Sequence, residues 1–445
     1  MSKPHILIVS QHFFPESFRI NDIAKEWVRR GYRVTVLTGI PNYPQGRFYP
    51  EYGLTRKRRE TWNGVEILRI PVIPRGHSTP GMVFDSFSFA LSGFFWNLTT
   101  RLKADLVFSF ETSPMTQVRI GCRYSRRHHV PHFLYAQDLW PENVEMVTGI
   151  HSPLVIGPID RMVDRIYRET DRIFVTSPSF VEAVTGRRIT VPGEKVHYWP
   201  QYAEEFYRPM DREEARTKVS GMAESCAEET QREVLRRLLS DDSFKIVFTG
   251  NIGAAQGLEI LPGTAEILKR ARQDPAHPGI RFVIVGDGRN REHFEGAIRE
   301  HGVEDCFLLI PRQPADRIPA LLACCDAAFL SFADSPLWEK TIPAKLQSYM
   351  ACAMPILAAA GGETARILLE ADCGLASSTG DEAALADAIR RMADMTDDER
   401  HALGRNARIY CGEHFDKHRL MDEMDRFFEE SLKTCRTGRK QHCAS

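Results

Sequence analysis

A glycine-rich segment follows an apolar, strand-like run in the second half of the chain. The sequence reads KIVFTG and then NIGAAQG, with Gly250, Gly253 and Gly257 in the loop, before a helical pattern begins at Leu258. Glycines let the backbone approach a phosphate closely, and the unpaired N–H groups at a helix start favour an anion. The spacing differs from both the GxxxxGK loop of nucleotide triphosphatases and the dinucleotide fingerprint GxGxxG. We interpret the segment as a diphosphate site; a tight turn without a ligand is the alternative.

A second glycine turn follows the next strand-like run, IRFVIV. It consists of Gly286, Asp287 and Gly288. Ligands of open parallel sheets bind outside the carboxyl ends of the strands, so both glycine turns are expected to face one ligand. Asp287 is predicted to brace its own turn, with contact to a nucleotide as the alternative.

Short apolar runs alternate with longer helical patterns along the chain, which indicates parallel β-α-β units. The rhythm stops in the proline- and aromatic-rich segment 199–211 and then restarts. We therefore predict an α/β protein with two Rossmann-like, doubly wound parallel-sheet domains facing a central cleft. The first is expected at residues 1–205 and the second at 206–415, and a helical segment, 416–445, is expected to pack back onto the first. The predicted strands are residues 6–10, 33–39, 66–72, 106–110, 132–135, 172–176, 196–199, 245–249, 281–285, 306–310, 327–332, 355–359 and 374–376.

Composition excludes several classes of protein. The chain has 445 residues, 43% of them hydrophobic, and a formal net charge of -1, so its overall field attracts neither nucleic acid nor an anionic membrane. Ten cysteines are scattered without CxxC pairs or metal-ligand spacing, which favours reduced thiols and no metal site. Residues 1–10 lack the pattern of a secretory signal, and no apolar span is long enough for a membrane anchor. We expect a cytoplasmic protein.

Taken in order, the motifs resemble those of the family 4 retaining glycosyltransferases of GT-B fold. The second half contributes FTGNIGAAQGL, RFVIVGDG and WEKTIPAKLQSYMACAMPILAAAGGETARILLEADCGL. The first half contributes ILIVSQHFFPESFRI, GYRVTVLTGIPNYPQG and YAQDLWPENVEM, which resemble the bacterial O-antigen and capsule amino-sugar transferases of the N-acetylfucosamine type. The resemblance covers roughly residues 4–430.

The resemblance implies the reaction. A sugar moves from a nucleotide diphosphate sugar, expected to be a UDP-linked N-acetyl or deoxy sugar, to a hydroxyl acceptor with retention at the anomeric carbon. No metal or separate cofactor is implied. The implied acceptor is a glycan, or a glycan linked to polyprenyl diphosphate, used in surface polysaccharide or lipopolysaccharide synthesis at the inner face of the cell membrane.

The resemblance also assigns donor-side residues, and here the chain departs from the family. The Glu-x7-Glu element falls at Glu339, expected at the donor sugar, and Gln347, expected at the ribose. An ordinary exposed loop is the alternative for Glu339. The usual Arg and Lys after the glycine-loop strand fall at the uncharged Asn251 and Gln256, so the phosphate charge must be met elsewhere. Lys345, at a predicted helix start, is the best replacement, with a solvated surface lysine as the alternative.

Four further residues complete the predicted site. Arg312 is a second basic candidate, at the place where the family's backbone holds the base. Gly362 and Glu363 follow the strand PILAA on the same edge, where their N–H groups would reach the sugar or phosphate; helix capping by Glu363 is the alternative. In the first domain, Asp138 follows the strand HFLY and is predicted to hydrogen-bond the reacting sugar or the acceptor. Ordering of the LWPE turn is the alternative for Asp138.

A helical pattern over residues 82–98 raises the question of membrane contact. Its apolar stripe is most simply interpreted as core, whereas Phe89 and Trp96 fall off the stripe and are expected to be exposed. Exposed aromatics near the basic clusters 56–59 and 123–129 favour peripheral membrane binding, with a solvated face as the alternative. The stripe consists of Val83, Phe84, Phe87, Leu91, Phe94, Phe95 and Leu98.

Two other functions fit the same motifs. A sugar-nucleotide epimerase of the same architecture would bind the donor without an acceptor. A non-catalytic nucleotide-sugar-binding partner is suggested by the uncharged residues Asn251, Gln256 and Gln347. Release of nucleotide diphosphate only in the presence of an acceptor distinguishes transfer from both.

Overall fold

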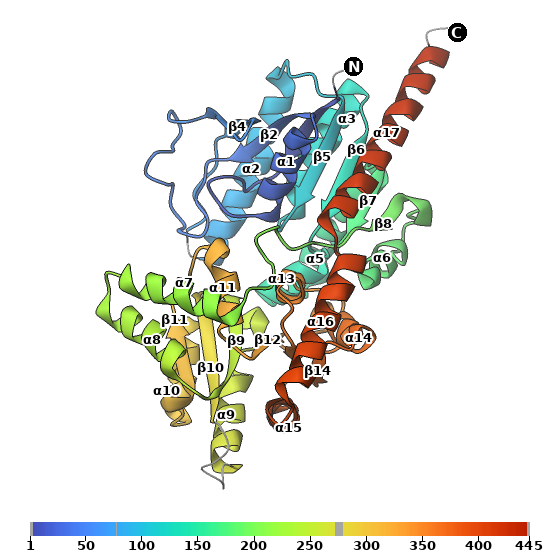
Figure 1. Cartoon of the computed structure of the whole chain (residues 1–445). Helices are drawn as coiled ribbons and strands as arrows, with labels where there is room; N and C mark the ends of the chain where they lie inside the picture. The colour runs from blue at the N-terminus through green and yellow to red at the C-terminus, as the bar shows by residue number, and fades with distance from the viewer. Residues whose placement is uncertain (1–2, 77, 272–278, 443–445) are drawn as a thin grey trace. The chain divides into compact units, whose positions relative to one another are not determined.

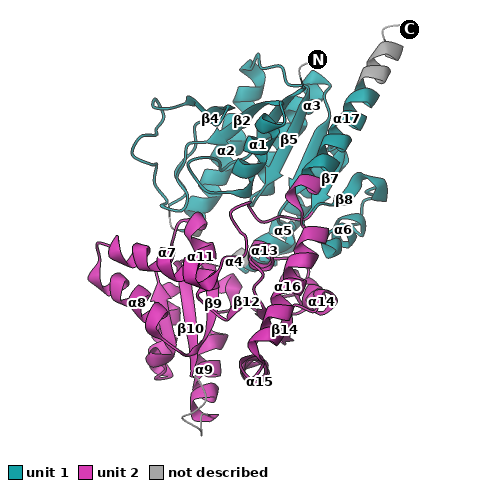
Figure 2. Cartoon of the chain, viewed as in Figure 1, with its two compact units in different colours: residues 1–199, 421–445 teal, residues 200–420 magenta. Residues whose placement is uncertain are grey.

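The structure, a computed structural model, describes residues 3–76, 78–271 and 279–442. The chain forms two compact units (Figures 1 and 2). Unit 1 consists of residues 1–199 and 421–445, and unit 2 consists of residues 200–420. Among the described residues, no helix combines the length and the hydropathy that crossing a bilayer requires.

Unit 1 is built on an eight-stranded sheet in the order β3-β4-β2-β1-β5-β6-β7-β8. All neighbouring strands are parallel except β3 and β4. The central strands are apolar and buried, as a sheet covered on both faces requires. The strands are β1 (His5–Val9), β2 (Arg33–Gly39), β3 (Arg59–Trp62), β4 (Val65–Ile70), β5 (Leu106–Glu111), β6 (His132–Ala136), β7 (Arg172–Val175) and β8 (Val196–Tyr198). The helices are α1 (Arg19–Arg29), α2 (Thr79–Thr99), α3 (Val118–His128), α4 (Glu142–Thr148), α5 (Pro153–Glu169) and α6 (Pro178–Thr185).

The antiparallel edge strand β3 is an addition to the predicted parallel sheet. This strand was not predicted from the sequence, because β3 begins at the end of the basic cluster 56–59 and its side chains are only exposed or half-buried. Asn63 and Gly64, both at positive φ, connect it to β4. An Asn-Gly pair between two strands is the strongest short-range signal of a β-hairpin. The sequence therefore carried a signal for β3.

Unit 2 is built on a six-stranded, fully parallel sheet in the order β11-β10-β9-β12-β13-β14. Its core is formed by apolar side chains of β9, β10 and the helices beside them, among them Phe248 and Leu261. The strands are β9 (Phe244–Asn251), β10 (Ile280–Asp287), β11 (Phe307–Ile310), β12 (Ala327–Ser331), β13 (Ile356–Ala359) and β14 (Gly374–Ser377). The helices are α7 (Arg212–Glu224), α8 (Glu229–Ser240), α9 (Ile260–Ala271), α10 (Arg291–Glu300), α11 (Ile318–Ala323), α12 (Pro336–Glu339), α13 (Ala344–Ala351), α14 (Gly362–Ala371), α15 (Glu382–Ala393) and α16 (Asp397–His414).

The last helix, α17 (Lys417–His442), contributes to the core of unit 1. Phe428 is fully buried, with its ring 5.3 Å from that of Trp27 and 4.9 Å from that of Phe133. Arg30, which follows α1, pairs with Asp422 of α17 at 2.5 Å. The aromatic contacts bury the apolar side of the helix and the ion pair fixes its polar side.

Helix α2 exposes the face that we predicted to be buried. Phe89, predicted to be exposed, is fully buried, and Trp96 is half-buried. Contacts with α3 decide which side of α2 faces inward. A Cβ at Gly93 of α2 would overlap the side chain of Ile120 of α3, and the Asn97 amide of α2 donates to the Ile120 carbonyl at 3.1 Å. Periodicity predicts that a stripe exists but not which side the neighbouring helix covers. The exposed stripe consists of Val83, Phe84, Phe87, Leu91, Phe94, Phe95 and Leu98.

Candidate functional site

The loops at the carboxyl ends of the unit 2 strands form the candidate site. The strand order reverses at β9, which has β10 on one side and β12 on the other. Open α/β sheets bind ligands outside the carboxyl ends of the strands at such a point. The glycine loop follows β9 there, and α13 and α14 begin at the same edge. No N-cap side chain bonds the first turn of either helix, so its leading N–H groups are available to an anion.

Most N–H groups of the glycine loop are used within the protein. That of Ile252 donates to the carbonyl of Asp287 at 2.9 Å, and that of Gly253 donates to the side-chain oxygen of Gln256 at 3.1 Å. The N–H groups of Gln256 and Gly257 donate to carbonyls of the loop itself. The loop is therefore a self-supporting turn, and it offers an anion fewer donors than its glycines suggest.

The second glycine turn holds two strand ends together. Gly286 pairs with Gly250 in the sheet, and a Cβ at Gly286 would overlap the Gly250 carbonyl oxygen. The exposed Asn251 pairs with Asp287 in the same register. The Asp287 carboxylate accepts the N–H of Gly288 at 2.8 Å, which confirms that Asp287 braces its own turn. The absence of a side chain at Gly286 thus permits the ends of β9 and β10 to pack closely at the edge of the site.

Lys345 lies in the first turn of α13, beside the glycine loop. Its Nζ is 3.9 Å from the centroid of the Phe248 ring and 3.9 Å from the position of a Cβ at Gly250. Burial lowers the pKa of Lys345 to about 7, and no neighbouring charge raises it again. A partly buried cation without a compensating charge is costly unless an anion joins it. The arrangement therefore favours an anionic ligand at this position.

The start of α14 lies against Glu339. A Cβ at Gly362 would overlap the Glu339 carbonyl, and Gly362 has a φ of 55° that disfavours other residues. The side chain of Glu339 is exposed, with Oε1 3.5 Å from the position of a Cβ at Gly361. Glu363 is buried and pairs with Arg366 at 2.5 Å, so an arginine of its own helix meets part of its charge.

Gln347 and Arg312 show no contact with the glycine loop like that of Lys345. Gln347 is fully buried, and its amide, in the orientation that satisfies its neighbours, donates to the carbonyls of Pro343 and Ala344 at 2.9 and 3.1 Å. These bonds occupy the amide nitrogen at the start of α13, and contact between Gln347 and a ribose stays a prediction. Arg312 is exposed beyond the end of the edge strand β11, two strands away from β9. Lys345 is thus the basic candidate nearest the glycine loop.

In unit 1, Asp138 lies at the carboxyl edge of the sheet and orders two loops. Its carboxylate accepts hydrogen bonds from the N–H of Ser113 at 2.9 Å and from the Ser113 hydroxyl at 2.7 Å. That hydroxyl oxygen also accepts from Trp140 Nε1 at 3.0 Å and from Asn143 Nδ2 at 2.5 Å. These bonds tie the loop after β5 to the loop after β6. The ordering role that we gave as the alternative is therefore present.

Sequence reasoning missed Glu111, the last residue of β5. Glu111 is fully buried, and no side chain among the described residues donates a hydrogen bond to its carboxylate. Burial, reinforced by the charge of Asp138, raises the pKa of Glu111 well above its ordinary value, although the backbone N–H groups of Asp138 and Gln137 act in the opposite direction. The buried hydroxyl of Tyr167 has no hydrogen-bond partner among the described residues. A buried carboxyl with a strongly raised pKa is a candidate functional group. The only signal of it in the sequence was the acidic residue at the end of the apolar run LVFSFE.

We expect Glu111→Gln to stabilise the protein at neutral and alkaline pH. The raised pKa means that stability is lost as pH rises from the unfolded-state pKa toward the folded-state pKa, and glutamine removes that loss. The gain should be about 1–3 kcal/mol at about pH 8 and should shrink toward about pH 4.5. Thermal unfolding across this range measures it, with the exposed Glu182→Gln as the matched control. A difference between variant and wild type that does not change with pH would contradict the assignment.

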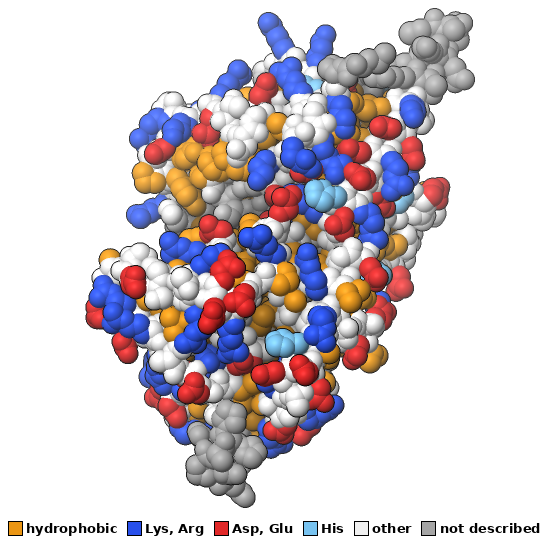
Figure 3. Space-filling model, in the orientation of Figure 1, with side chains coloured by type: hydrophobic (Ala, Val, Ile, Leu, Met, Phe, Trp, Pro, Cys, Tyr) orange, Lys and Arg blue, Asp and Glu red, His pale blue; other side chains and the backbone are white. Residues whose placement is uncertain are grey.

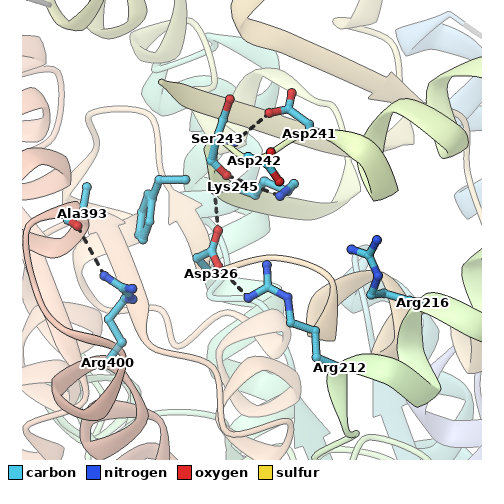
Figure 4. Close-up of a pocket in the computed structure, with 10 residues that line it drawn as sticks. Arg212, Arg216, Asp241, Asp242, Ser243, Lys245, Asp326, Ala393 and Arg400 are labelled. Carbon is cyan, nitrogen blue, oxygen red and sulfur yellow. Dashed lines mark hydrogen bonds and ion pairs between the residues drawn. The ribbon is translucent and has the colours of Figure 1, made fainter. Parts of the chain in front are cut away.

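A charged pocket of about 210 Å³ lies at the opposite edge of the unit 2 sheet (Figure 4). Ser243 and Lys245 line it from the start of β9, and Asp326 lines it just before β12. The Asp326 carboxylate accepts the N–H of Lys245 at 2.7 Å and pairs with Arg212 of α7 at 3.1 Å. Because acidic and basic groups compensate one another here, the pocket is best explained as a junction that fixes α7 to the sheet.

Comparison with known proteins agrees with the fold. Residues 17–201 match the family model described as Glycosyl transferase 4-like domain, and residues 230–410 match that described as Glycosyl transferases group 1. A putative colanic acid biosynthesis glycosyl transferase, WcaI of Escherichia coli, is 25% identical over 358 residues, which cover 78% of this chain and 81% of the relative.

Solved structures share the fold at low sequence identity. Sucrose-phosphate synthase from Thermosynechococcus elongatus aligns over 100% of both chains with a TM-score of 0.69 and 15% identity. Anabaena HepE, solved in complex with UDP and glucose, aligns over 96% of this chain and 100% of its own with a TM-score of 0.67 and 15% identity. The two family matches, one in each half, and this two-sheet architecture establish that the chain belongs to the glycosyltransferases of GT-B fold, group 1 and 4-like.

Proposed function

We propose that this glycosyltransferase holds a nucleotide diphosphate sugar at the carboxyl edge of unit 2, with Lys345 at the diphosphate. The observation that carries the proposal is the uncompensated ammonium group of Lys345 beside the glycine loop. An anion there would also attract the leading N–H groups of α13 and α14. Negative charge grows on the diphosphate as the sugar leaves, so a fixed cation stabilises the transition state more than the ground state.

The proposed donor is a UDP-linked N-acetyl or deoxy sugar. The similar fold of HepE, which was solved with UDP and glucose, supports the choice of base. Glu339, exposed beside the start of α14, is proposed to contact the donor sugar, and Arg312 remains a proposed contact for the base. The leaving diphosphate can take the acceptor proton, so transfer with retention needs no protein nucleophile.

Transfer is proposed to be independent of a metal, because Lys345 supplies the positive charge at the diphosphate. We expect the transfer rate to be unchanged by a chelator such as EDTA. Loss of activity on chelation, restored by a divalent cation, would contradict this part of the proposal.

The proposed acceptor is the hydroxyl of a glycan carried on polyprenyl diphosphate, in surface polysaccharide synthesis at the inner face of the cell membrane. The likeness to the colanic acid transferase supports this choice. Asp138, at the carboxyl edge of the unit 1 sheet, is the proposed acceptor-side residue.

A thermal-shift screen tests the proposed donor. A ligand that binds only the folded state increases the free energy of unfolding, by about 2.7 kcal/mol at a ligand concentration of about 100 times its Kd. The melting temperature rises accordingly. We expect UDP to raise the melting temperature more than GDP or dTDP. Equal shifts would reject the choice of base, and no shift with any of the three would reject the nucleotide-sugar site.

The products distinguish transfer from the two other functions. A transferase releases UDP in step with acceptor glycosylation, whereas an epimerase converts the donor sugar without any acceptor. A non-catalytic partner does neither. We expect UDP release to require the acceptor, as measured by coupled detection of UDP with and without a membrane extract that contains lipid-linked glycans.

A further inference from the structure

The outer face of α2 is entirely apolar. Between residues 83 and 98, seven side chains of this helix are exposed, with exposed fractions between 36% and 65%, and all seven are aliphatic or aromatic. The span is about 22 Å long at a rise of 1.5 Å per residue. An apolar patch of this length on a protein surface marks an interaction site.

The polarity of α2 is the reverse of that of an ordinary surface helix. Its only charged residue, Asp85, is buried and accepts a hydrogen bond from the Gln11 amide at 2.9 Å. Asn97 is buried as well, bonded to the Ile120 carbonyl. The polar groups of the helix are thus satisfied inside unit 1 while its large apolar groups face outward. Packing within unit 1 gives no reason for this arrangement, which points to an apolar medium on the outside.

The charged side chains beside this face are basic. Helix α3, which packs against α2, has the sequence VRIGCRYSRRH without an acidic residue, and its four arginines are exposed. The guanidinium of Arg123 lies 3.9 Å from the centroid of the exposed Phe94 ring. Arg119 lies one turn earlier on α3, and Arg101 and Lys103 are exposed just after α2. By contrast, acidic and basic side chains are interleaved over the face of the molecule drawn in Figure 3.

We propose that the exposed stripe of α2 inserts into the surface of an anionic phospholipid bilayer, with the arginines of α3 at the lipid phosphates. Phenylalanine and leucine on one side of a helix lie in the interfacial region, and each nearby basic residue adds attraction to an anionic surface. A second copy of the chain fits this surface less well. A symmetric interface brings the same patch of both copies together, so Arg119 and Arg123 of one copy would face the same two arginines of the other. The proposal rests on this surface alone and not on the chemistry of unit 2.

Vesicle co-sedimentation of the full chain tests the proposal. We expect binding to vesicles of phosphatidylcholine with about 30% phosphatidylglycerol, little binding to phosphatidylcholine alone, and weakening at high salt. Phe87→Ser with Phe95→Ser should lower the partition coefficient at least about tenfold. Leu369→Ser, which removes an exposed leucine of unit 2, is the matched control and should bind like wild type.

A second pair of variants tests the basic rim. Arg119→Glu with Arg123→Glu should lower binding to the anionic vesicles at least about tenfold and abolish its salt dependence, whereas Arg391→Glu in unit 2 should not. All variants should keep their thermal shift with UDP, which separates failure at the membrane from failure of the donor site. Wild-type binding by the α2 variants would overturn the proposal. So would a wild-type dimer in sedimentation velocity that the α2 variants dissolve, because the stripe would then be a contact between copies.

Discussion

Replacing Lys345 with methionine should lower kcat/KM about 100- to 1,000-fold while the protein stays folded. The lysine is the charge that we place at the leaving diphosphate, and removing one preorganised electrostatic contact of this kind has an effect of that size. Methionine keeps the length and the contact with Phe248 but removes the cation. The measurement is initial-rate kinetics with the donor varied at saturating acceptor.

The same substitution should raise stability below about pH 10, because it removes a buried ammonium group. The folded-state pKa of Lys345 lies below its unfolded value, so the unfolded chain binds more protons and wild-type stability rises with pH above about 7. Lys345→Met should therefore gain most near neutral pH and gain little at high pH. Lys25→Met, at an exposed lysine of α1 in unit 1, is the control and should change neither activity nor stability. Full activity in Lys345→Met would remove Lys345 from the site.

Gly286→Ala should destabilise unit 2 by more than about 3 kcal/mol, the range reached when a core or backbone contact cannot relax. The new Cβ would overlap the Gly250 carbonyl, which belongs to the adjacent strand and cannot turn aside as a flexible side chain would. Denaturant unfolding measures the change. Because the two strand ends must separate, we expect UDP binding to be lost as well.

Gly296→Ala is the matched control for this prediction. Gly296 lies within α10, and a Cβ there would meet no atom within 4 Å. Alanine is a better helix former than glycine, so this variant should gain about 0.5–1 kcal/mol. If Gly286→Ala were as stable as wild type, the close packing of β9 against β10 could not be the reason for the glycine.

The alternation of apolar runs predicted nearly every strand of both sheets, because buried parallel strands carry their signal in consecutive residues. Each predicted run matches an observed strand to within about two residues. The exception, β3, is a half-exposed edge strand whose charged residues hide it, although Asn63 and Gly64 mark its turn. Sequence therefore reports best on the strands that are covered on both faces.

Side-chain roles were harder to predict because they depend on contacts between distant segments. Lys345 was predicted beside the glycine loop and lies there. This position could be predicted because nearby residues indicate both where a helix begins and where a strand ends. The complete burial of Gln347 and of Glu111 follows from neighbours far along the chain. The outward face of α2 was assigned the wrong way round for the same reason, since Ile120 of α3 decides it.

Proton uptake on UDP binding tests whether Lys345 binds the diphosphate as an ammonium group. Isothermal titration calorimetry at about pH 8, in buffers of different ionisation enthalpy, counts the protons taken up on binding. With its pKa near 7 in the free protein, Lys345 is mostly neutral there and must gain a proton to meet the diphosphate. We expect uptake of nearly one proton by the wild type and almost none by Lys345→Met, which should also bind UDP more weakly. Tight binding without proton uptake by the wild type, or equal uptake by both proteins, would contradict it.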